Sequence, residues 1–183
     1  MLNIKKSLCV LMLMSTSMMV NANDVVKNDI REEVQTWIDI EVAQKKSTIQ
    51  KMVFSCDFYV ASPKFKTPDG GTTGIGGYLF YKNGEQLDSL VQPSSNETMP
   101  ALQSCIKPNF TVTDEDSAQL LMEAIESVFS QDQMFSDSFE KQVKRTTKGW
   151  ELITGDFFED LSGYIIKTDK AGKITQIRYS LNL

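Results

Sequence analysis

The chain has 183 residues, contains no histidine and carries a formal net charge of −5 at pH 7. Without histidine, Ser-His-Asp and Cys-His catalysis, histidine-ligated zinc and the usual proton shuttle near neutral pH are excluded. The acidic balance argues against nucleic acid as a partner, because nucleic-acid binding needs a basic surface. The composition therefore favours a globular protein that uses no cofactor and no metal ion.

Residues 1–22 have the pattern of a secretory signal peptide. Lys5 and Lys6 form a positively charged start, an apolar run covers residues 8–20, and a cleavage motif ends at Ala22. The apolar run is too short for a membrane-spanning helix, which needs about 20 mostly apolar residues. We expect cleavage after Ala22, no membrane span in the mature chain, and export to the periplasm or the extracellular medium.

Two cysteines, Cys56 and Cys105, remain after removal of the signal peptide. Both lie among apolar residues, and an oxidising compartment favours their pairing. Their long separation is unlike the Cys-x-x-Cys motif of redox proteins. We therefore predict a structural disulfide between them, with two buried free thiols as the alternative.

In the amino-terminal part, apolar residues that recur every three or four positions predict a helix over 24–46. Alternating apolar and polar residues then predict a long strand over 52–61 with one buried face. The glycine-rich segment 62–77 is predicted as a loop, either a mobile linker or a partner-contacting loop. A hairpin over 77–91 is expected to turn at Asn83-Gly84, the preferred pair for a type I′ turn.

The carboxy-terminal part is expected to begin with a short helix over 100–106, followed by a main helix that Thr113 caps. Acidic residues in the first turn of this helix suit its dipole, and an apolar stripe extends from Leu120 to Phe129. Two hairpins complete the chain, with turns at 147–149 and 169–172.

Helices grouped beside hairpins indicate an α+β fold rather than a parallel sheet. The expected form is one domain over residues 23–183, a twisted antiparallel sheet with two amphipathic helices packed on one face. Gly77-Tyr78-Leu79-Phe80 is similar to Gly163-Tyr164-Ile165-Ile166. This similarity allows two related helix-plus-sheet halves, 23–98 and 99–183, and chance explains it equally well.

Two surfaces could bind a partner. The first is a basic cluster beside an aromatic residue, formed by Lys141, Lys144, Arg145, Lys148 and Trp150. It could hold an anionic ligand or an acidic partner, or its lysines could protect an edge strand from pairing. The second is the loop over 62–77, in which Phe65, Asp69 and Ile75 could contact a partner.

Two classes of function stay open. The first is a secreted or periplasmic, non-enzymatic module that binds a protein partner, as an inhibitor or an immunity-type protector does. The second is a carrier of a small apolar ligand, with a pocket between sheet and helices lined by aromatic residues: Phe54, Phe58, Tyr78 and Phe158. An apolar cavity of several hundred Å³ would favour the carrier, and a filled core with an exposed loop would favour the protein binder.

A hydrolase that uses paired carboxylates is the third hypothesis. Asp156 and Glu159 could supply an acid and a base, as in glycoside hydrolysis. Adjacent carboxylates in a turn are usually solvated, so we expect no catalytic residue in this chain.

Overall fold

The computed structural model describes residues 22–34, 39–66, 69–70, 72–74, 77–90, 98–129, 140–156 and 162–180. The predicted signal peptide lies outside this part of the chain, apart from Ala22. Within it, the strands form two antiparallel sheets that are accompanied by helices. The α+β class predicted from the sequence is therefore confirmed.

The elements follow one another in two groups. The first sheet contains β1 (Asp39–Lys45), β2 (Asp57–Lys66), β3 (Thr72–Gly74), β4 (Tyr78–Asn83) and β5 (Gln86–Ser89), in the order β1-β2-β4-β5 with β3 on β2. The second sheet is a meander of β6 (Glu140–Thr146), β7 (Gly149–Asp156), β8 (Ser162–Thr168) and β9 (Ile174–Ser180). The helices are α1 (Ala22–Val34), α2 (Thr48–Val53), α3 (Pro100–Ser104) and α4 (Glu115–Phe129).

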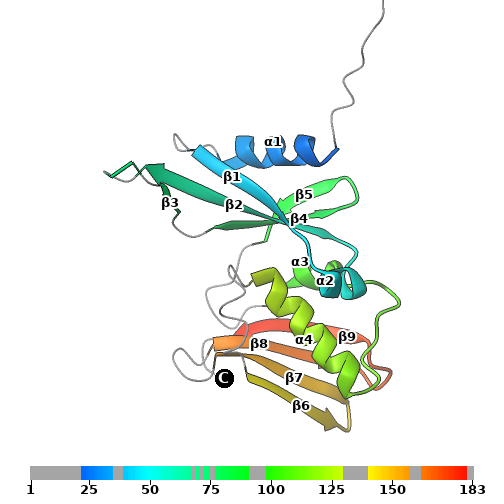
Figure 1. Cartoon of the computed structure of the whole chain (residues 1–183). Coiled ribbons are helices and arrows are strands. Elements are labelled where there is room, and N and C mark those ends of the chain that lie inside the picture. Colours follow the sequence, from blue (N-terminus) through cyan, green and yellow to red (C-terminus); the bar gives the residue numbers. More distant parts are fainter. Residues whose placement is uncertain are drawn as a thin grey trace, which may run out of the picture.

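The helices and sheets lie in layers (Figure 1). The helix α1 covers the outer face of the first sheet, and α2, α3 and α4 lie between the two sheets. The main core joins Leu121 and Ile125 of α4 to Phe58 of the first sheet and to Leu152 and Ile177 of the second. The sequence predicted one sheet with both amphipathic helices on one face. Instead, α1 packs on the first sheet and α4 contacts the second.

The amino-terminal helix is shorter than the sequence predicted. It ends at Val34, and the chain forms β1 from Asp39 onward. Val26 and Ile30 of α1 and Val42 of β1 are buried in the same small core. Apolar residues recur at helical spacing in both α1 and β1 because both elements face the same core. The sequence pattern therefore predicted one helix where the chain forms a helix and then a strand.

The long strand predicted over 52–61 is also divided. Val53 still belongs to α2, and β2 begins at Asp57 and extends into the segment predicted as a loop. The neighbours Phe58 and Tyr59 are both buried, Phe58 in the main core and Tyr59 in the core under α1. The first sheet is covered on both faces. The alternation of buried and exposed residues, which is typical of a strand with one face in water, therefore does not hold in β2.

The turn between β4 and β5 differs from the prediction by one residue. Asn83 pairs with Gln86 across the hairpin, so Gly84 and Glu85 form the turn. Gly84 has a φ of 60°, a conformation that glycine adopts without steric cost.

The start of α4 also differs by one residue, because Asp114 caps the helix in place of Thr113. The carboxylate of Asp114 accepts a hydrogen bond of 2.8 Å from the backbone N–H of Ser117. Hydrogen bonds from Ser117 lower the pKa of Asp114, as expected for an acid at a helix start.

The order of a helix and then a four-stranded path occurs twice along the chain. The helix α1 precedes β1-β2-β4-β5, and α4 precedes β6-β7-β8-β9. The tetrapeptide that begins at Gly77 overlaps the start of β4, and the one that begins at Gly163 lies in β8; these are the third strands of the two paths. Related halves over 23–98 and 99–183 stay a prediction.

Candidate functional sites

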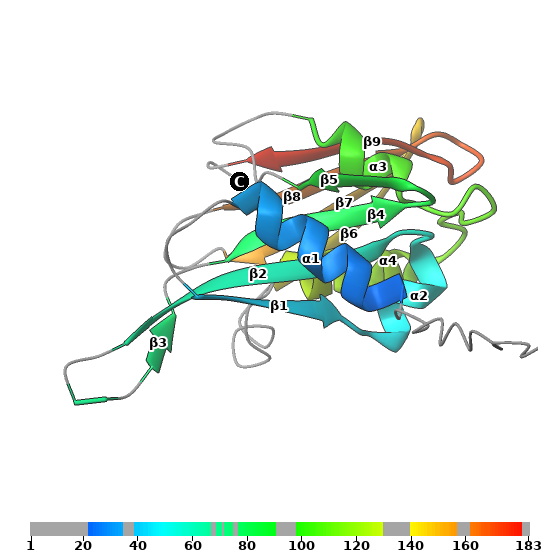
Figure 2. The same cartoon turned by 90° about the horizontal axis from the view of Figure 1, so that it is seen from above.

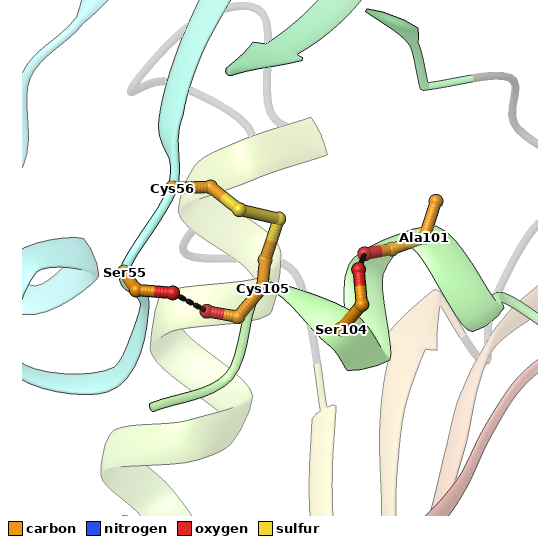
Figure 3. The surroundings of a disulfide bond; sticks show 5 residues. All are labelled: Ser55, Cys56, Ala101, Ser104 and Cys105. Carbon is orange, nitrogen blue, oxygen red and sulfur yellow. Dashed lines mark hydrogen bonds between the residues drawn. A yellow bond between two sulfur atoms is a disulfide. The ribbon is translucent and has the colours of Figure 1, made fainter. Parts of the chain in front are cut away.

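Cys56 and Cys105 form the disulfide that the sequence predicted (Figure 3). Their sulfur atoms are 2.02 Å apart and their Cα atoms 5.2 Å apart, and both residues are buried. The N–H and the hydroxyl of Ser55 donate hydrogen bonds of 2.8 and 3.0 Å to the carbonyl oxygen of Cys105. The disulfide therefore joins the start of β2 to the end of α3, and it is consistent with an oxidising, exported location.

The structure divides the predicted basic cluster between the two faces of the second sheet. Along β6, Lys141 and Arg145 share the face toward α4, and Lys144 lies on the opposite face. Lys144 is paired with Glu151 in the register of β6 and β7, and the carboxylate of Glu151 forms an ion pair of 3.3 Å with Lys167 on β8. Lys144 thus belongs to a row of alternating charges on the outer face of the sheet.

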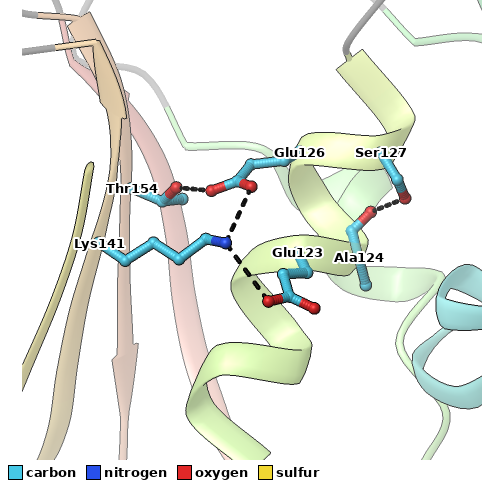
Figure 4. A network of polar contacts seen from close by, with 6 residues as sticks. All are labelled: Glu123, Ala124, Glu126, Ser127, Lys141 and Thr154. Atoms are coloured by element: carbon cyan, nitrogen blue, oxygen red, sulfur yellow. Dashed lines mark hydrogen bonds and ion pairs between the residues drawn. The ribbon is translucent and has the colours of Figure 1, made fainter. Parts of the chain in front are cut away.

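Lys141 is engaged within the molecule (Figure 4). Its Nζ lies 3.4 Å from a carboxylate oxygen of Glu123 and 3.4 Å from one of Glu126. Both acids belong to α4, so the lysine connects the edge strand β6 to this helix. It is therefore a weaker candidate for partner binding than the sequence suggested.

Arg145, Lys148 and Trp150 stay together at one end of the second sheet. The guanidinium carbon of Arg145 lies 5.2 Å from the ring centroid of Trp150. The indole of Trp150 packs against the main core, and Lys148 is exposed in the turn between β6 and β7. Of the predicted cluster, Arg145 and Trp150 are in direct contact, and Lys148 lies in the turn next to them.

Glu126 is a buried acid that the sequence analysis missed. It is 5% exposed, and it accepts a hydrogen bond from the hydroxyl of Thr154, which is 0% exposed. Burial raises the pKa of Glu126, and the hydrogen bond from Thr154 and the ammonium group of Lys141 act in the opposite direction. The sequence did offer one indication of this buried acid, because Glu126 follows Ile125 within the apolar stripe of α4.

The strand β3 and the far end of β2 form a hairpin that extends away from the rest of the first sheet (Figures 1 and 2). β2 pairs with β4 from Asp57 to Ala61 and with β1 as far as Lys64. Beyond Lys64, the strand pairs with β3 alone among the described strands. We call this hairpin, described at residues 65–66, 69–70 and 72–74, the β2–β3 arm.

The arm contains two of the three residues predicted for the loop. Phe65 lies in β2 opposite Thr73, and Asp69 is exposed at the turn. Ile75 lies outside the described residues. The loop prediction was thus wrong about the secondary structure, because β2 and β3 pair there. The contact residues themselves remain a prediction.

A cavity of about 360 Å³ lies between the first sheet and the carboxy-terminal end of α4. Its apolar wall includes Val60 and Leu79, which are paired across β2 and β4, and Val128 and Phe129 of α4. Tyr78 also lines it, as the sequence suggested for a ligand pocket. Phe54 and Phe58, also suggested for such a pocket, fill the main core instead. Phe158 lies outside the described residues.

Lys45 is the charged residue among the described side chains that line this cavity. Its Nζ donates a hydrogen bond of 2.8 Å to the carbonyl oxygen of Val128 in the last turn of α4. A cation is favourable at this end of a helix. Burial lowers the pKa of Lys45 to about 8, so the ammonium form is less stable here than in water.

A comparison of the chain with protein-family models, curated proteins and solved structures found no match. The described residues contain no group of three or more potential metal ligands of the His, Cys, Asp or Glu type. In the same part of the chain, no helix has the length and apolar character needed to cross a membrane.

Proposed function

We propose that this chain is an exported, non-enzymatic binding protein whose β2–β3 arm contacts a protein partner, as an inhibitor or an immunity-type protector would. The observation that carries the proposal is the projection of the arm beyond the sheet (Figure 2). A hairpin that extends from a sheet can enter a concave surface of a partner. The disulfide is consistent with an oxidising, exported location, as this proposal requires.

The end of the second sheet is a second surface in this proposal. An arginine that lies over a tryptophan ring presents a cation and an aromatic face together, and both residue types are enriched in binding hot spots. Arg145, Lys148 and Trp150 could therefore bind an acidic segment of a partner. This surface belongs to the second sheet and the arm belongs to the first, so the two surfaces can be tested separately.

Site-specific photo-crosslinking in the native cell envelope tests both surfaces. We expect a crosslinking amino acid at the position of Asp69, in the arm, to give a discrete product with one partner. The same amino acid at Lys148 tests the second surface. A matched control replaces Glu85, which is exposed in the turn between β4 and β5. Equal products from all three positions, or none from Asp69 and Lys148, would contradict the proposal.

A shortened arm provides the second test. Replacing residues 65–73 with Asn-Gly joins Lys64 to Gly74 and leaves the pairing of β2 with β1 and β4 in place. We expect this variant to fold, to keep its disulfide, and to lose the partner captured through Asp69. Retention of that partner at parental affinity would show that the arm is not the contact surface.

The cavity supports a second candidate function, the carriage of a small apolar ligand. Its volume of about 360 Å³ falls in the lower part of the range for ligand sites, roughly 300–1,000 Å³. The carboxylate-dependent hydrolase stays a third hypothesis. Asp156 ends β7, Glu159 lies outside the described residues, and loss of a measured turnover in Asp156→Asn would support it.

A further inference from the structure

We propose that the cavity between the first sheet and α4 binds an uncharged aromatic molecule with the size of two fused rings, stacked on the ring of Phe129. This inference rests on the carrier function and deepens it, because it names the chemical class of the ligand. It concerns a different part of the molecule from the β2–β3 arm, so its failure would leave the arm proposal untouched.

The walls of the cavity favour an apolar ligand. Val60 and Leu79 line it, and they are paired across β2 and β4. The neighbouring pair on the same face of the sheet, Phe58 and Tyr81, lies in the main core. Val60 and Leu79 therefore point from the sheet toward α4, because residues two positions apart in a strand face the same side. Val128 contributes to the opposite wall from the last turn of α4.

A row of aromatic rings leads from the second sheet to this cavity. The ring centroids of Tyr179 on β9 and Tyr164 on β8 are 5.4 Å apart. The ring of Phe129 on α4 is stacked on Tyr164, with a centroid distance of 4.9 Å and an interplanar angle of 24°. Phe129 also lines the cavity. An aromatic ligand would extend the row by one member, and aromatic pairs at such distances are more stable than their buried area alone implies.

The volume of the cavity sets the size of the ligand. It is about 360 Å³. In another protein, a dry apolar cavity of roughly 150 Å³ holds one benzene ring. The cavity beside Phe129 therefore has room for two fused rings, whereas a single ring would leave much of its apolar wall uncovered.

Lys45, the charged residue among the described side chains that line the cavity, is engaged within the protein. Its Nζ donates a hydrogen bond of 2.8 Å to the carbonyl oxygen of Val128. A charged ligand would lose its hydration against the apolar walls, and an anion would also compete with the protein for this ammonium group. An uncharged ligand avoids both costs.

Calorimetric titration of the intact, oxidised protein at pH 7 measures the preference for an aromatic ligand directly. The probes are naphthol, which is uncharged at this pH, its saturated counterpart decahydronaphthol, and the anion naphthoate. We expect naphthol to bind at one site per chain and about two- to tenfold more tightly than decahydronaphthol, because stacking contributes beyond the buried area. Naphthoate should bind more weakly than naphthol. The comparison needs no variant, so it stands even if a substitution prevents folding.

Substitutions then assign the preference to one ring. Phe129→Leu keeps an apolar wall and removes the ring, so it should abolish the preference for naphthol and leave decahydronaphthol binding within about twofold of the parent. Phe110→Leu is the matched control, because Phe110 is also partly buried against the main core and does not line the cavity. Retained binding of decahydronaphthol is the folding control for both variants.

Filling the cavity separates this inference from the carrier function. Val60→Phe should occupy the space and weaken naphthol and decahydronaphthol alike. The aromatic inference is overturned, while the carrier function stands, if both bind the parent equally or if naphthoate binds at least as tightly as naphthol. It is also overturned if Phe129→Leu keeps the preference, or if Phe110→Leu abolishes it as well. If none of the three molecules binds, or Val60→Phe has no effect on binding, the cavity is not a ligand site and both ideas fail.

Discussion

The hydroxyl of Thr154 on β7 donates a hydrogen bond to the carboxylate of Glu126 on α4, and both residues are buried (Figure 4). Lys141 on β6 reaches the other oxygen of the same carboxylate, at 3.4 Å. A buried polar group is costly unless it is hydrogen-bonded, so the three residues depend on one another. This contact connects α4 to two neighbouring strands of the second sheet.

The coupling between Thr154 and Glu126 can be measured as a stability difference. Glu126→Leu leaves the buried hydroxyl of Thr154 without its acceptor, which should cost about 1–3 kcal/mol of unfolding free energy. Combining it with Thr154→Val should cost less than the sum of the two single changes, because no unpaired hydroxyl remains. Urea unfolding at pH 7 of the parent and the three variants gives the coupling energy. Additive effects would show that the hydrogen bond contributes nothing to stability.

Lys45 should make stability depend on pH above neutrality. Its pKa is about 8 in the folded protein and near 10.5 when unfolded, so the unfolded chain binds more protons between these values. Stability contributed by this group therefore increases as pH rises from about 8 to 10.5. We expect the parent to gain stability relative to Lys45→Met over this range, by less than about 1.4 kcal/mol per pH unit because the side chain is only partly buried.

Urea unfolding of both proteins at pH 7, 8, 9 and 10 checks this prediction. The contribution of every other titrating group cancels in the difference between parent and variant. A constant difference across the series would mean that the pKa of Lys45 is not lowered in the folded state.

The disulfide should contribute strongly to stability. Closing a loop between residues 49 positions apart constrains the unfolded chain, by up to roughly 4 kcal/mol in the chain-entropy model. The double variant Cys56→Ala, Cys105→Ala should therefore unfold at a lower urea concentration than the oxidised parent. The reduced parent is the control, because it keeps both sulfur atoms in the core. A reduced parent as stable as the oxidised one would contradict the prediction.

Thiol titration of exported, unreduced protein tests the disulfide and the predicted processing together. Removal of residues 1–22 also removes Cys9, so the denatured mature protein should contain no free thiol. Mass spectrometry should find Asn23 as the first residue. One free thiol per chain together with an intact Met1 would show that the signal peptide was retained.

The apolar stripe of α4 provides a matched pair of neighbouring leucines. Leu121 is fully buried in the main core, and Leu120 is only partly buried beside it. Leu121→Ala should cost roughly 2–5 kcal/mol of unfolding free energy, and Leu120→Ala should cost clearly less. Thermal or urea unfolding measures both. Equal losses would show that Leu120 is buried as deeply as Leu121, and that the stripe faces the core differently.

Local patterns in the chain were sufficient for several elements. The stripe and acidic first turn of α4 predicted its position, and the turn residues near Lys148 and Asp169 predicted the hairpins of the second sheet. These features depend on residues that are close in sequence. The pairing of Cys56 with Cys105 also followed from the sequence, because the mature chain is expected to contain two cysteines and both have apolar neighbours.

The candidate sites were predicted less well. Alternation along β6 separates Lys144 from Lys141 and Arg145, and the sequence analysis grouped all three. The acceptors of Lys141 lie on α4, about 15 to 18 positions earlier in the chain, so no local pattern could reveal them. The cavity beside Lys45 depends on how α4 ends against the first sheet, which is again a contact between distant segments.

Local chemistry thus determined the α+β class, the disulfide and most of the turns, because helical spacing, cysteine number and turn residues act over a few positions. The tertiary structure alone decided that the strands form two sheets and that the first is covered on both faces. The end of α1 before β1 could be seen only in the tertiary structure, because both elements face one core. The burial of Glu126 within the apolar stripe was likewise visible only there. In each case the physical reason is the same. The burial of a residue depends on which distant segment packs over it, and a local sequence pattern contains no information about that segment.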